Sequence, residues 1–269
     1  MDTGTKYDTL AKFESWFSKR NKTYAVHKKL QFERDEPYIG IEDINDWLAI
    51  NFPLKNGAQL LDAGCGNGKT IFTFAYLYNI NGFGISLSKN EIVLAEKAAI
   101  ALNLSSRCFF EVKSYDEPFA PKFDQIIAIE SLKHSKDLKF SLQNLASSLK
   151  PGGLLIIVED IRIGSLPNNR FFNLLLKNWS MIDLFSNEDY SDAANIAGLA
   201  PKREIDFTHL VKMRKAWWSF CLVYFLQLIK NLTPFSTTRK IISIFQAGFA
   251  LEYYYKKGFM EYKVLIFNR

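Results

Sequence analysis

The sequence predicts an α/β protein with a mostly parallel sheet and helices on both of its faces. A short apolar run, Leu60-Leu61, ends in an acid and leads into a turn with three glycines, after which 71–77 can form a helix. A second run, 123–130, is nearly uniformly apolar at its centre. Such a run is typical of a parallel strand that is buried on both faces. Strand, glycine turn and helix in this order open a nucleotide-type α/β domain.

Length and composition limit the remaining possibilities. A chain of 269 residues can form one large α/β domain or a core with a cap. The 23 Phe, 12 Tyr and 5 Trp suit a large core or a pocket for an apolar or cationic molecule. The net charge of +6 is spread over scattered basic pairs, which is typical of a solvated surface. Without zinc-finger spacing, we expect neither a structural metal nor a nucleic-acid partner.

The cysteines and the hydropathy pattern predict a cytoplasmic protein. Cys65, Cys108 and Cys221 do not make a disulfide framework, and the N-terminus lacks a basic-then-apolar signal. The most apolar run, 216–229, is shorter than the ~20 residues that a membrane span needs. We interpret it as a buried or interfacial helix, so peripheral membrane contact stays open. Nothing in the sequence indicates an oligomeric state.

The remaining elements follow from hydrophobic periodicity and from turn residues. The expected strands after the glycine turn are 82–86, 108–112, 123–130, 154–159, 203–207 and 261–267. The expected helices are 41–50, 71–77, 88–101 and 187–198, and one in the apolar run 216–229. A further expected helix has Leu138, Leu142, Leu145 and Leu149 on one face and stops at 151–153. We predict a helical segment over 1–55 that covers the ligand site. A second unit, 56–269, would carry a helical substrate cap at about 165–250.

Three interpretations compete for the glycine turn. A dinucleotide-binding turn needs a third glycine where this chain has Lys69, and an acid where the second strand ends in Ser86. A phosphate-binding loop is matched by 68–70, but Ala63 replaces its first glycine and Asp62 precedes it. A triphosphate is disfavoured next to a carboxylate, whereas a sulfonium cofactor with a cationic amino-acid tail is favoured there.

The stretch from Leu60 to Gly68 resembles motif I of class I S-adenosylmethionine-dependent methyltransferases. Residues 82–91 resemble the corresponding segment of cyclopropane fatty acid synthases and sterol methyltransferases, and the stop at 150–153 is a further hallmark. The resemblance covers about residues 55–160. It implies S-adenosyl-L-methionine as cofactor and a Rossmann-like fold with a seven-stranded sheet.

The resemblance also implies a set of cofactor contacts. They are Asp62, Gly64, Cys65, Gly66, Gly68, Ser86, Leu87, Glu91, Tyr115 and Asp116. Glu91 stands where the family has a glutamine and can still accept ribose hydroxyls. Ser88 and Glu91 also fit a capping box that starts the next helix. Asp116 also fits a turn residue before Pro118.

Residues 130–134 sit at the carboxyl end of the fourth strand, where open α/β sheets place ligands. They resemble the E-[AS]-x-x-H segment of sterol C-methyltransferases and the glutamate-serine pair of prenyl diphosphate C-methyltransferases. The resemblance implies that Glu130 stabilises cationic charge or accepts a proton, and that His134 is an auxiliary base or a substrate contact. A helix-capping role for Glu130 and a structural role for His134 stay open.

Aromatic residues complete the expected site, with Tyr24, Tyr38, Trp217 and Trp218 as candidates for the substrate pocket. The sequence thus predicts a methyltransferase for a hydrophobic small molecule, acting at a carbon of an isoprenoid, sterol or lipid alkene. One alternative is O- or N-methylation of a secondary metabolite, with His134 as base. Other classes are a P-loop nucleotide-binding protein and a catalytically silent scaffold with the cofactor fold.

Overall fold

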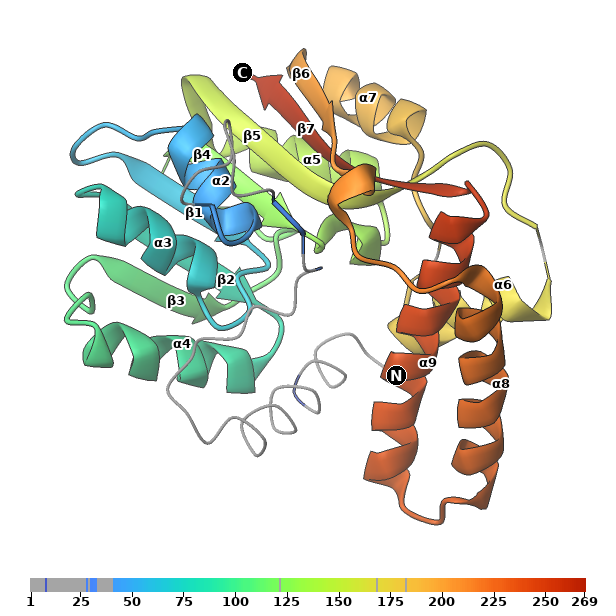
Figure 1. Cartoon of the computed structure of the whole chain (residues 1–269). Helices are drawn as coiled ribbons and strands as arrows, with labels where there is room; N and C mark the ends of the chain where they lie inside the picture. Colours follow the sequence, from blue (N-terminus) through green and yellow to red (C-terminus); the bar gives the residue numbers. More distant parts are fainter. Residues whose placement is uncertain are drawn as a thin grey trace.

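The computed structural model describes residues 8, 28, 30–32, 41–120, 122–167, 169–181 and 183–269. Its centre is a seven-stranded sheet with the strand order β3-β2-β1-β4-β5-β7-β6 (Figure 1). The strands are β1 Gln59–Ala63, β2 Asn81–Ser86, β3 Cys108–Val112, β4 Phe123–Ile129, β5 Leu149–Arg162, β6 Ala200–Asp206 and β7 Met260–Asn268. All pairs are parallel except those of β7, which runs antiparallel to β5 and β6. The predicted mostly parallel, seven-stranded sheet is confirmed.

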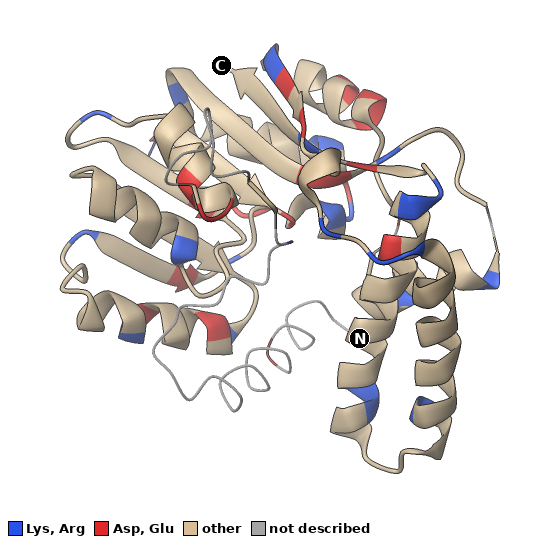
Figure 2. Cartoon of the chain, in the orientation of Figure 1, with Lys and Arg blue, Asp and Glu red and all other residues tan. Residues whose placement is uncertain are grey.

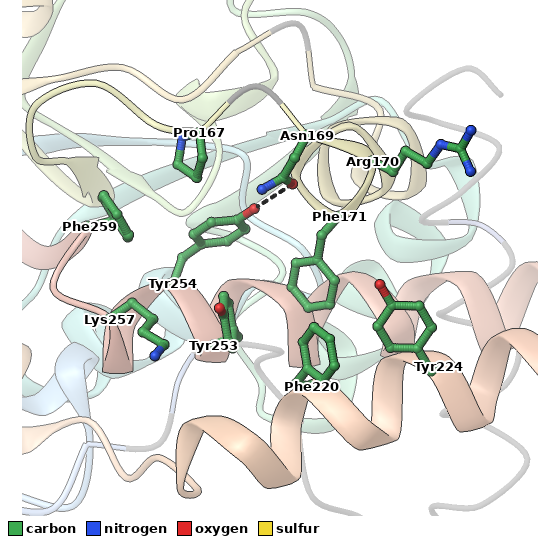
Figure 3. Close-up of a pocket in the computed structure, with 10 residues that line it drawn as sticks. All are labelled: Pro167, Asn169, Arg170, Phe171, Phe220, Tyr224, Tyr253, Tyr254, Lys257 and Phe259. Atoms are coloured by element: carbon green, nitrogen blue, oxygen red, sulfur yellow. Dashed lines mark hydrogen bonds between the residues drawn. The ribbon is translucent and has the colours of Figure 1, made fainter.

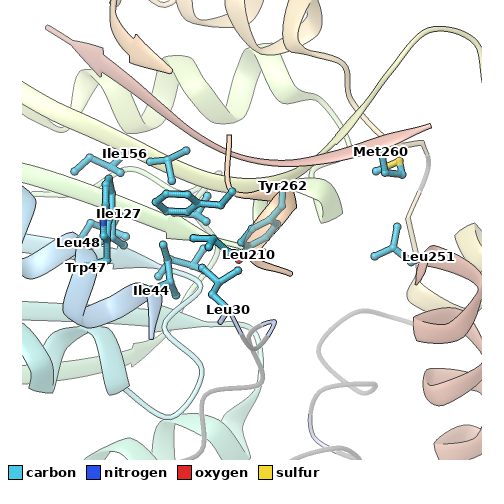
Figure 4. Packing of buried hydrophobic residues seen from close by; sticks show 14 of the residues in the cluster. Leu30, Ile44, Trp47, Leu48, Ile127, Ile156, Leu210, Leu251, Met260 and Tyr262 are labelled. Carbon is cyan, nitrogen blue, oxygen red and sulfur yellow. The ribbon is translucent and has the colours of Figure 1, made fainter. Parts of the chain in front are cut away.

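Helices cover both faces of this sheet. They are α2 Ile44–Asn51, α3 Lys69–Leu77, α4 Lys89–Ala101, α5 Leu138–Ser147, α6 Arg170–Trp179, α7 Asn187–Ile196, α8 Ala216–Leu232 and α9 Ser236–Lys256. One apolar cluster joins α2 and α3 to the sheet, and Figure 4 shows Trp47 beside Ile127 and Ile156 of the strands. A second cluster joins α5 and α7 to the other face through side chains such as Leu142 and Tyr190. No described helix is both long and apolar enough to cross a membrane.

The boundary between α5 and β5 differs from the sequence prediction. Leu138, Leu142 and Leu145 are buried on one face of α5, as expected. The helix ends at Ser147, however, and Leu149 already pairs with Phe123 as the first residue of β5. The proline and glycines at 151–153 fall within β5, where the pairing with β4 shifts register. The predicted strand 154–159 is therefore only the central part of β5.

The helical cap is built from two separate insertions. Helix α6 lies between β5 and β6, whereas α8 and α9 form a hairpin between β6 and β7. Helix α9 packs against both α6 and α8, and the hairpin projects away from the sheet (Figure 1). Helix α7 instead packs on α5 and β6. The range 165–250 is thus not one continuous cap, because residues 187–196 belong to the layer that covers the sheet.

A buried glutamine connects the three cap helices. The Gln246 amide of α9 donates to the Val223 carbonyl of α8 at 3.0 Å and to Gln227 Oε1 at 3.0 Å. Its Oε1 accepts from Asn178 Nδ2 of α6 at 3.0 Å. A buried polar group without a partner costs stability, so this one side chain satisfies groups on both neighbouring helices.

We expect Gln246→Ala to lower the free energy of unfolding by about 2–3 kcal/mol, because it leaves polar groups of α6 and α8 without a partner. Chemical denaturation followed by circular dichroism measures this loss. Gln143→Ala, on the exposed surface of α5, is the matched control and should change stability by less than about 0.5 kcal/mol. Equal effects of the two substitutions would show that the bonds of Gln246 do not hold the cap together.

Candidate active site

The glycine turn places a buried carboxylate at the carboxyl end of β1. Asp62 is buried, and its Oδ2 atom has no hydrogen-bond partner among the described residues. Burial raises the pKa of Asp62 to about 7, against a smaller opposite effect of the Thr70 hydroxyl. Four residues later in the same turn, Gly66 has φ +51° and open space where a side chain would lie. The turn therefore offers an acceptor and room for a polar ligand group.

Two glycines are required by their neighbours. Gly64 has φ +109°, and a Cβ there would lie 2.4 Å from Ser131 Cβ. Ser131 Oγ also donates to the Ala63 carbonyl at 2.6 Å, so the turn and the loop after β4 are packed together. Gly68, with φ +89°, precedes α3 and lies against the Phe110 ring. These contacts fix the shape of the cradle.

The lysine of the turn does not face the cradle as a phosphate ligand would. Lys69 forms an ion pair with Asp43, the N-cap of α2. Its charge is thereby already balanced by a side chain outside the turn. The geometry supports the sulfonium interpretation over the phosphate-loop interpretation.

Cys65 follows Gly64 and is buried, and burial raises the pKa of its thiol well above the usual range.

At the end of β2, a serine and a glutamate form a second polar group. Ser86 Oγ donates to Glu91 Oε2 at 2.6 Å and accepts from the Ser88 backbone N–H at 3.0 Å. Ser88 caps α4 by accepting from the Glu91 N–H at 3.2 Å. The Glu91 carboxylate does not return a bond to Ser88, so only half of the expected capping box is present. Burial raises the pKa of Glu91. Leu87, the other expected contact at the end of β2, is exposed.

The expected adenine side of the cradle lies on the loop after β3. The Tyr115 hydroxyl donates to the Ser131 carbonyl at 3.4 Å. Asp116 accepts a hydrogen bond from Ser141 of α5, and its backbone N–H donates to Ser114 Oγ. One carboxylate oxygen of Asp116 is therefore directed to α5, and its turn role agrees with the alternative drawn from the sequence. The adenine contact stays a prediction.

Glu130 follows β4 with φ +50°, a left-handed conformation that is uncommon for a residue with a side chain. Its carboxylate accepts from the Lys28 backbone N–H at 3.0 Å and from the Tyr262 hydroxyl at 3.0 Å. The capping alternative for Glu130 is wrong, because Asp137 caps α5 and the short 3-10 helix Leu132–His134 has no side-chain cap. The backbone conformation instead directs Glu130 into a cluster of charged side chains.

A buried lysine holds this cluster together. Lys133 is 3% exposed, and its Nζ atom lies 3.3 Å from Glu130, 3.3 Å from Glu159 and 2.8 Å from Asp160. Lys28 Nζ reaches Asp160 at 2.5 Å and Glu130 at 3.5 Å. Three carboxylates and two ammonium groups thus meet at the carboxyl ends of β4 and β5.

The charges in the cluster shift one another's protonation. Burial raises the pKa of Glu159 to about 7, although Lys133 opposes this. Burial would also raise the pKa of Asp160, but the two lysines outweigh it and lower that pKa. Tyr255 donates to Asp160, and burial next to the carboxylates raises its pKa well above the usual range.

Of this cluster, the sequence predicts only Glu130 as a site residue. The missed members are Lys28, Lys133, Glu159, Asp160, Tyr255 and Tyr262. The sequence signal for two of them is the acid pair Glu159-Asp160 at the end of the apolar run 154–158. Parallel strands end at the same edge of a sheet, so this pair is expected near Glu130.

The other expected site residues are more scattered. His134 is half-buried in the 3-10 helix after Glu130, and its backbone N–H donates to the Ser131 carbonyl. Trp217 and Trp218 are 56% and 51% exposed and stack on each other with ring centres 4.2 Å apart. Tyr24 and Tyr38 lie outside the described residues. Among the described residues, no cluster of His, Cys, Asp or Glu suits a metal ion.

A cavity of about 520 Å³ lies among the cap helices (Figure 3). Its lining residues are Pro167, Asn169, Arg170, Phe171, Phe220, Tyr224, Tyr253, Tyr254, Lys257 and Phe259. The aromatic lining is the kind expected for a hydrophobic ligand, but it does not include the two tryptophans. On α9, Tyr254 donates to Asn169 at this cavity, whereas the next residue, Tyr255, donates to Asp160 in the charged cluster.

We expect Lys133→Met to lower the free energy of unfolding by about 3–5 kcal/mol, because it leaves three buried carboxylates with Lys28 alone. Without the lysine, the folded-state pKa values of these acids rise above their unfolded values. The protonated acids tolerate burial, so the loss should be smaller at pH 5.5 than at pH 8. Urea unfolding at both pH values measures it, with the exposed Lys136→Met as control. A pH-independent loss as small as that of the control would contradict the role given to Lys133.

The chain was compared with known proteins. The family model for mycolic acid cyclopropane synthetase matches residues 2–217. The 27-O-demethylrifamycin SV methyltransferase of Amycolatopsis mediterranei is 33% identical over 124 residues, which cover 45% of this chain and 46% of the relative. The chain spans about half the length of these curated relatives.

Two solved structures share the fold at low identity. The [4+2]-cyclase SpnF matches with a TM-score of 0.74 at 19% identity, over 99% of this chain and 94% of that chain. The geranyl diphosphate C-methyltransferase from Streptomyces coelicolor A3(2), in complex with S-adenosyl-L-homocysteine, matches with a TM-score of 0.69 at 15% identity, over 98% of both chains. Because the family model covers most of the chain, this protein belongs to the mycolic acid cyclopropane synthetase family of S-adenosylmethionine-dependent methyltransferases.

Proposed function

We propose that this protein transfers a methyl group from S-adenosyl-L-methionine to a small hydrophobic molecule. The observation that carries the proposal is the buried Asp62 oxygen, for which the described residues supply no partner, together with the open position at Gly66 in the same turn. A cationic amino-acid tail would provide the missing partner, and a buried charge needs one. Glu91, held by Ser86, would accept the ribose hydroxyls. When bound, the cofactor supplies an activated methyl group on a sulfonium.

We further propose that the methyl acceptor is a carbon of an isoprenoid, sterol or lipid alkene. As the methyl bonds to one alkene carbon and leaves the sulfur, positive charge develops on the neighbouring carbon. A fixed carboxylate nearby stabilises this charge and can then accept the proton that restores the alkene. Glu130 fits this role because Tyr262, Lys133 and the Lys28 backbone hold its carboxylate at the carboxyl end of β4. The aromatic cavity in the cap agrees with a hydrophobic substrate.

A second candidate is methyl transfer to oxygen or nitrogen, with His134 as general base. Both Glu130 oxygens already have partners, and two ammonium groups lie within 3.5 Å of one of them. These positive charges weaken the effect of Glu130 on a substrate cation. His134 lies close by in the following 3-10 helix. The relative from Amycolatopsis, which is named as a methyltransferase of 27-O-demethylrifamycin SV, agrees with this candidate.

Labelled cofactor, tested with prenyl diphosphates, sterols, unsaturated lipids, phenols and amines, identifies the acceptor. On that substrate we expect Glu130→Gln to lower kcat by about 100-fold or more, with unchanged cofactor affinity, because the interaction exists mainly in the transition state. His134→Ala should have a smaller effect, and Glu96→Gln on the exposed side of α4 is the control. A near-normal Glu130→Gln enzyme with an inactive His134→Ala enzyme would instead establish the second candidate.

Asp62→Asn separates the protein's own stability from cofactor binding. The folded-state pKa of about 7 lies above the ordinary value, so the contribution of Asp62 is favourable at low pH and is lost as pH rises from about 4 to 7. Asparagine cannot ionise, so the stability gained by the variant should be about 2 kcal/mol larger at pH 8 than at pH 5.5. Chemical denaturation at the two pH values measures this difference. Asp192→Asn, exposed on α7, should show none.

The same variant tests the cofactor. S-adenosyl-L-homocysteine should raise the Tm of the unmodified protein and should lose most of this effect in Asp62→Asn, while Mg-ATP should change neither Tm. Stabilisation by Mg-ATP, without any by S-adenosyl-L-homocysteine, would overturn the proposed function.

A further inference from the structure

The α8–α9 hairpin, residues 212–257, exposes an unusual amount of apolar surface. Among the residues that the structure describes, 21 large apolar side chains are exposed, and nine of them belong to this hairpin. The nine are Trp217, Trp218, Phe220, Tyr224, Phe225, Leu228, Leu232, Phe235 and Phe245. In α8 only Ser219 and Val223 are buried, so the solvent-facing side of this helix is its apolar side. A helix face on which large apolar side chains are exposed is typical of an interaction site.

The charge of the molecule is concentrated on the same hairpin. Residues 212–257 contain eight lysines and arginines and one acid, Glu252, which is a net charge of +7. The whole chain has 34 basic and 28 acidic residues, so the remaining 26 basic and 27 acidic residues give −1. Glu252 itself is paired with Arg214. Every other charged side chain in this range is positive, as Figure 2 shows for the blue positions on the projecting helices.

The tip of the hairpin combines both properties. Leu232 and Phe235, on either side of the turn between the helices, are 76% and 71% exposed. Lys230, Arg239 and Lys240 flank them in the sequence. Figure 1 shows this turn as the part of the hairpin that lies farthest from the sheet. Apolar side chains at a projecting tip, surrounded by basic ones, are suited to the boundary between lipid headgroups and acyl chains.

We propose that the α8–α9 hairpin docks this protein onto an anionic lipid surface, with Leu232 and Phe235 in the acyl boundary and Lys230, Arg239 and Lys240 against the headgroups. Charge complementarity selects this occupant. A second copy docked tip to tip would bring Lys230, Arg239 and Lys240 of both copies together, which is unfavourable for like charges. Aromatic rings along α8 prefer the interface between water and lipid, where one end is apolar and the other hydrated. The hairpin lies on the surface, because none of the described helices could span the bilayer.

The proposed surface is continuous with the cavity of the cap. Phe220 and Tyr224 of α8 belong both to the exposed apolar set and to the cavity lining. Lys257, at the other end of the hairpin, also lines the cavity. The exposed apolar side chains of α8 would therefore lead from the docked tip toward the cavity.

Vesicle sedimentation with the full chain tests the docking. The probes are vesicles of phosphatidylcholine alone and of phosphatidylcholine with 30% phosphatidylglycerol, without cofactor or substrate, so the result does not depend on the proposed function. We expect binding to the anionic vesicles to be at least tenfold tighter and to weaken with salt. The double variant Leu232→Ser/Phe235→Ser should bind at least tenfold more weakly. Lys240→Gln should weaken binding about fivefold.

The matched control is Tyr76→Ser/Ile100→Ser, which removes two side chains that are 87% and 68% exposed on α3 and α4. It should bind like the unmodified protein. The two double variants should also keep the unmodified Tm, because all four changed side chains are exposed. Equal affinity for neutral and anionic vesicles, or unchanged binding of the tip variant, would overturn the proposal. A concentration-dependent dimer that the tip variant loses would show that a second copy covers this face.

Discussion

The ion cluster around Lys133 is the interaction that joins the parts of this molecule. The lysine lies in the loop after β4, two of its carboxylate partners are on β5, and Glu130 adds the third. Tyr262 connects β7 to the cluster, Tyr255 connects α9 to it, and Lys28 contributes a second ammonium group. Charges in such a dry position need close partners, so the relative placement of these elements is tightly constrained. The cluster therefore connects the sheet to the cap at the edge where the site lies.

The glycine cradle depends on a different kind of constraint, which is close approach of backbone. Gly64 lies against Ser131, and Ser131 is the residue between Glu130 and the 3-10 helix that holds Lys133. The turn that would hold the cofactor and the loop that carries the charged cluster are thus in direct contact. Methyl transfer in line requires donor and acceptor to be held at a short, fixed separation. This contact provides a rigid connection between the two halves of the candidate site.

Much of the sheet could be predicted from the sequence, because its strands are continuous apolar runs bounded by turn residues. The strand over 108–112 agrees residue for residue, and β4 ends at Ile129, one residue before the predicted end. The end of α5 was wrong because pairing with β4, a tertiary contact, draws 149–153 into a strand despite its proline and glycines. The division of the cap could not be predicted either, because the amphipathic pattern of α7 does not indicate which element its apolar face packs against.

The candidate site was predictable where it consists of one local stretch and not where it is assembled from distant ones. The turn at 62–68 carries its own pattern of glycines and an acid. By contrast, Tyr262 meets Glu130 from 132 residues away, and no spacing rule links them. The half-formed cap at Ser88 shows a third case, in which Ser86 competes for the Glu91 carboxylate. Local sequence patterns indicate which side chains could form a hydrogen bond, and the tertiary structure determines which of these bonds form.

Consecutive tyrosines on α9 have a mechanical consequence. Tyr254 faces the cavity of the cap, where it contacts Asn169, and Tyr255 contacts Asp160 at the sheet edge. Two consecutive residues of a rigid helix move together when the helix rotates. Any rotation of α9 that reshapes the cavity also displaces a phenol from the carboxylates around Lys133. The volume available to a ligand and the electrostatics next to Glu130 are therefore not independently adjustable in this protein.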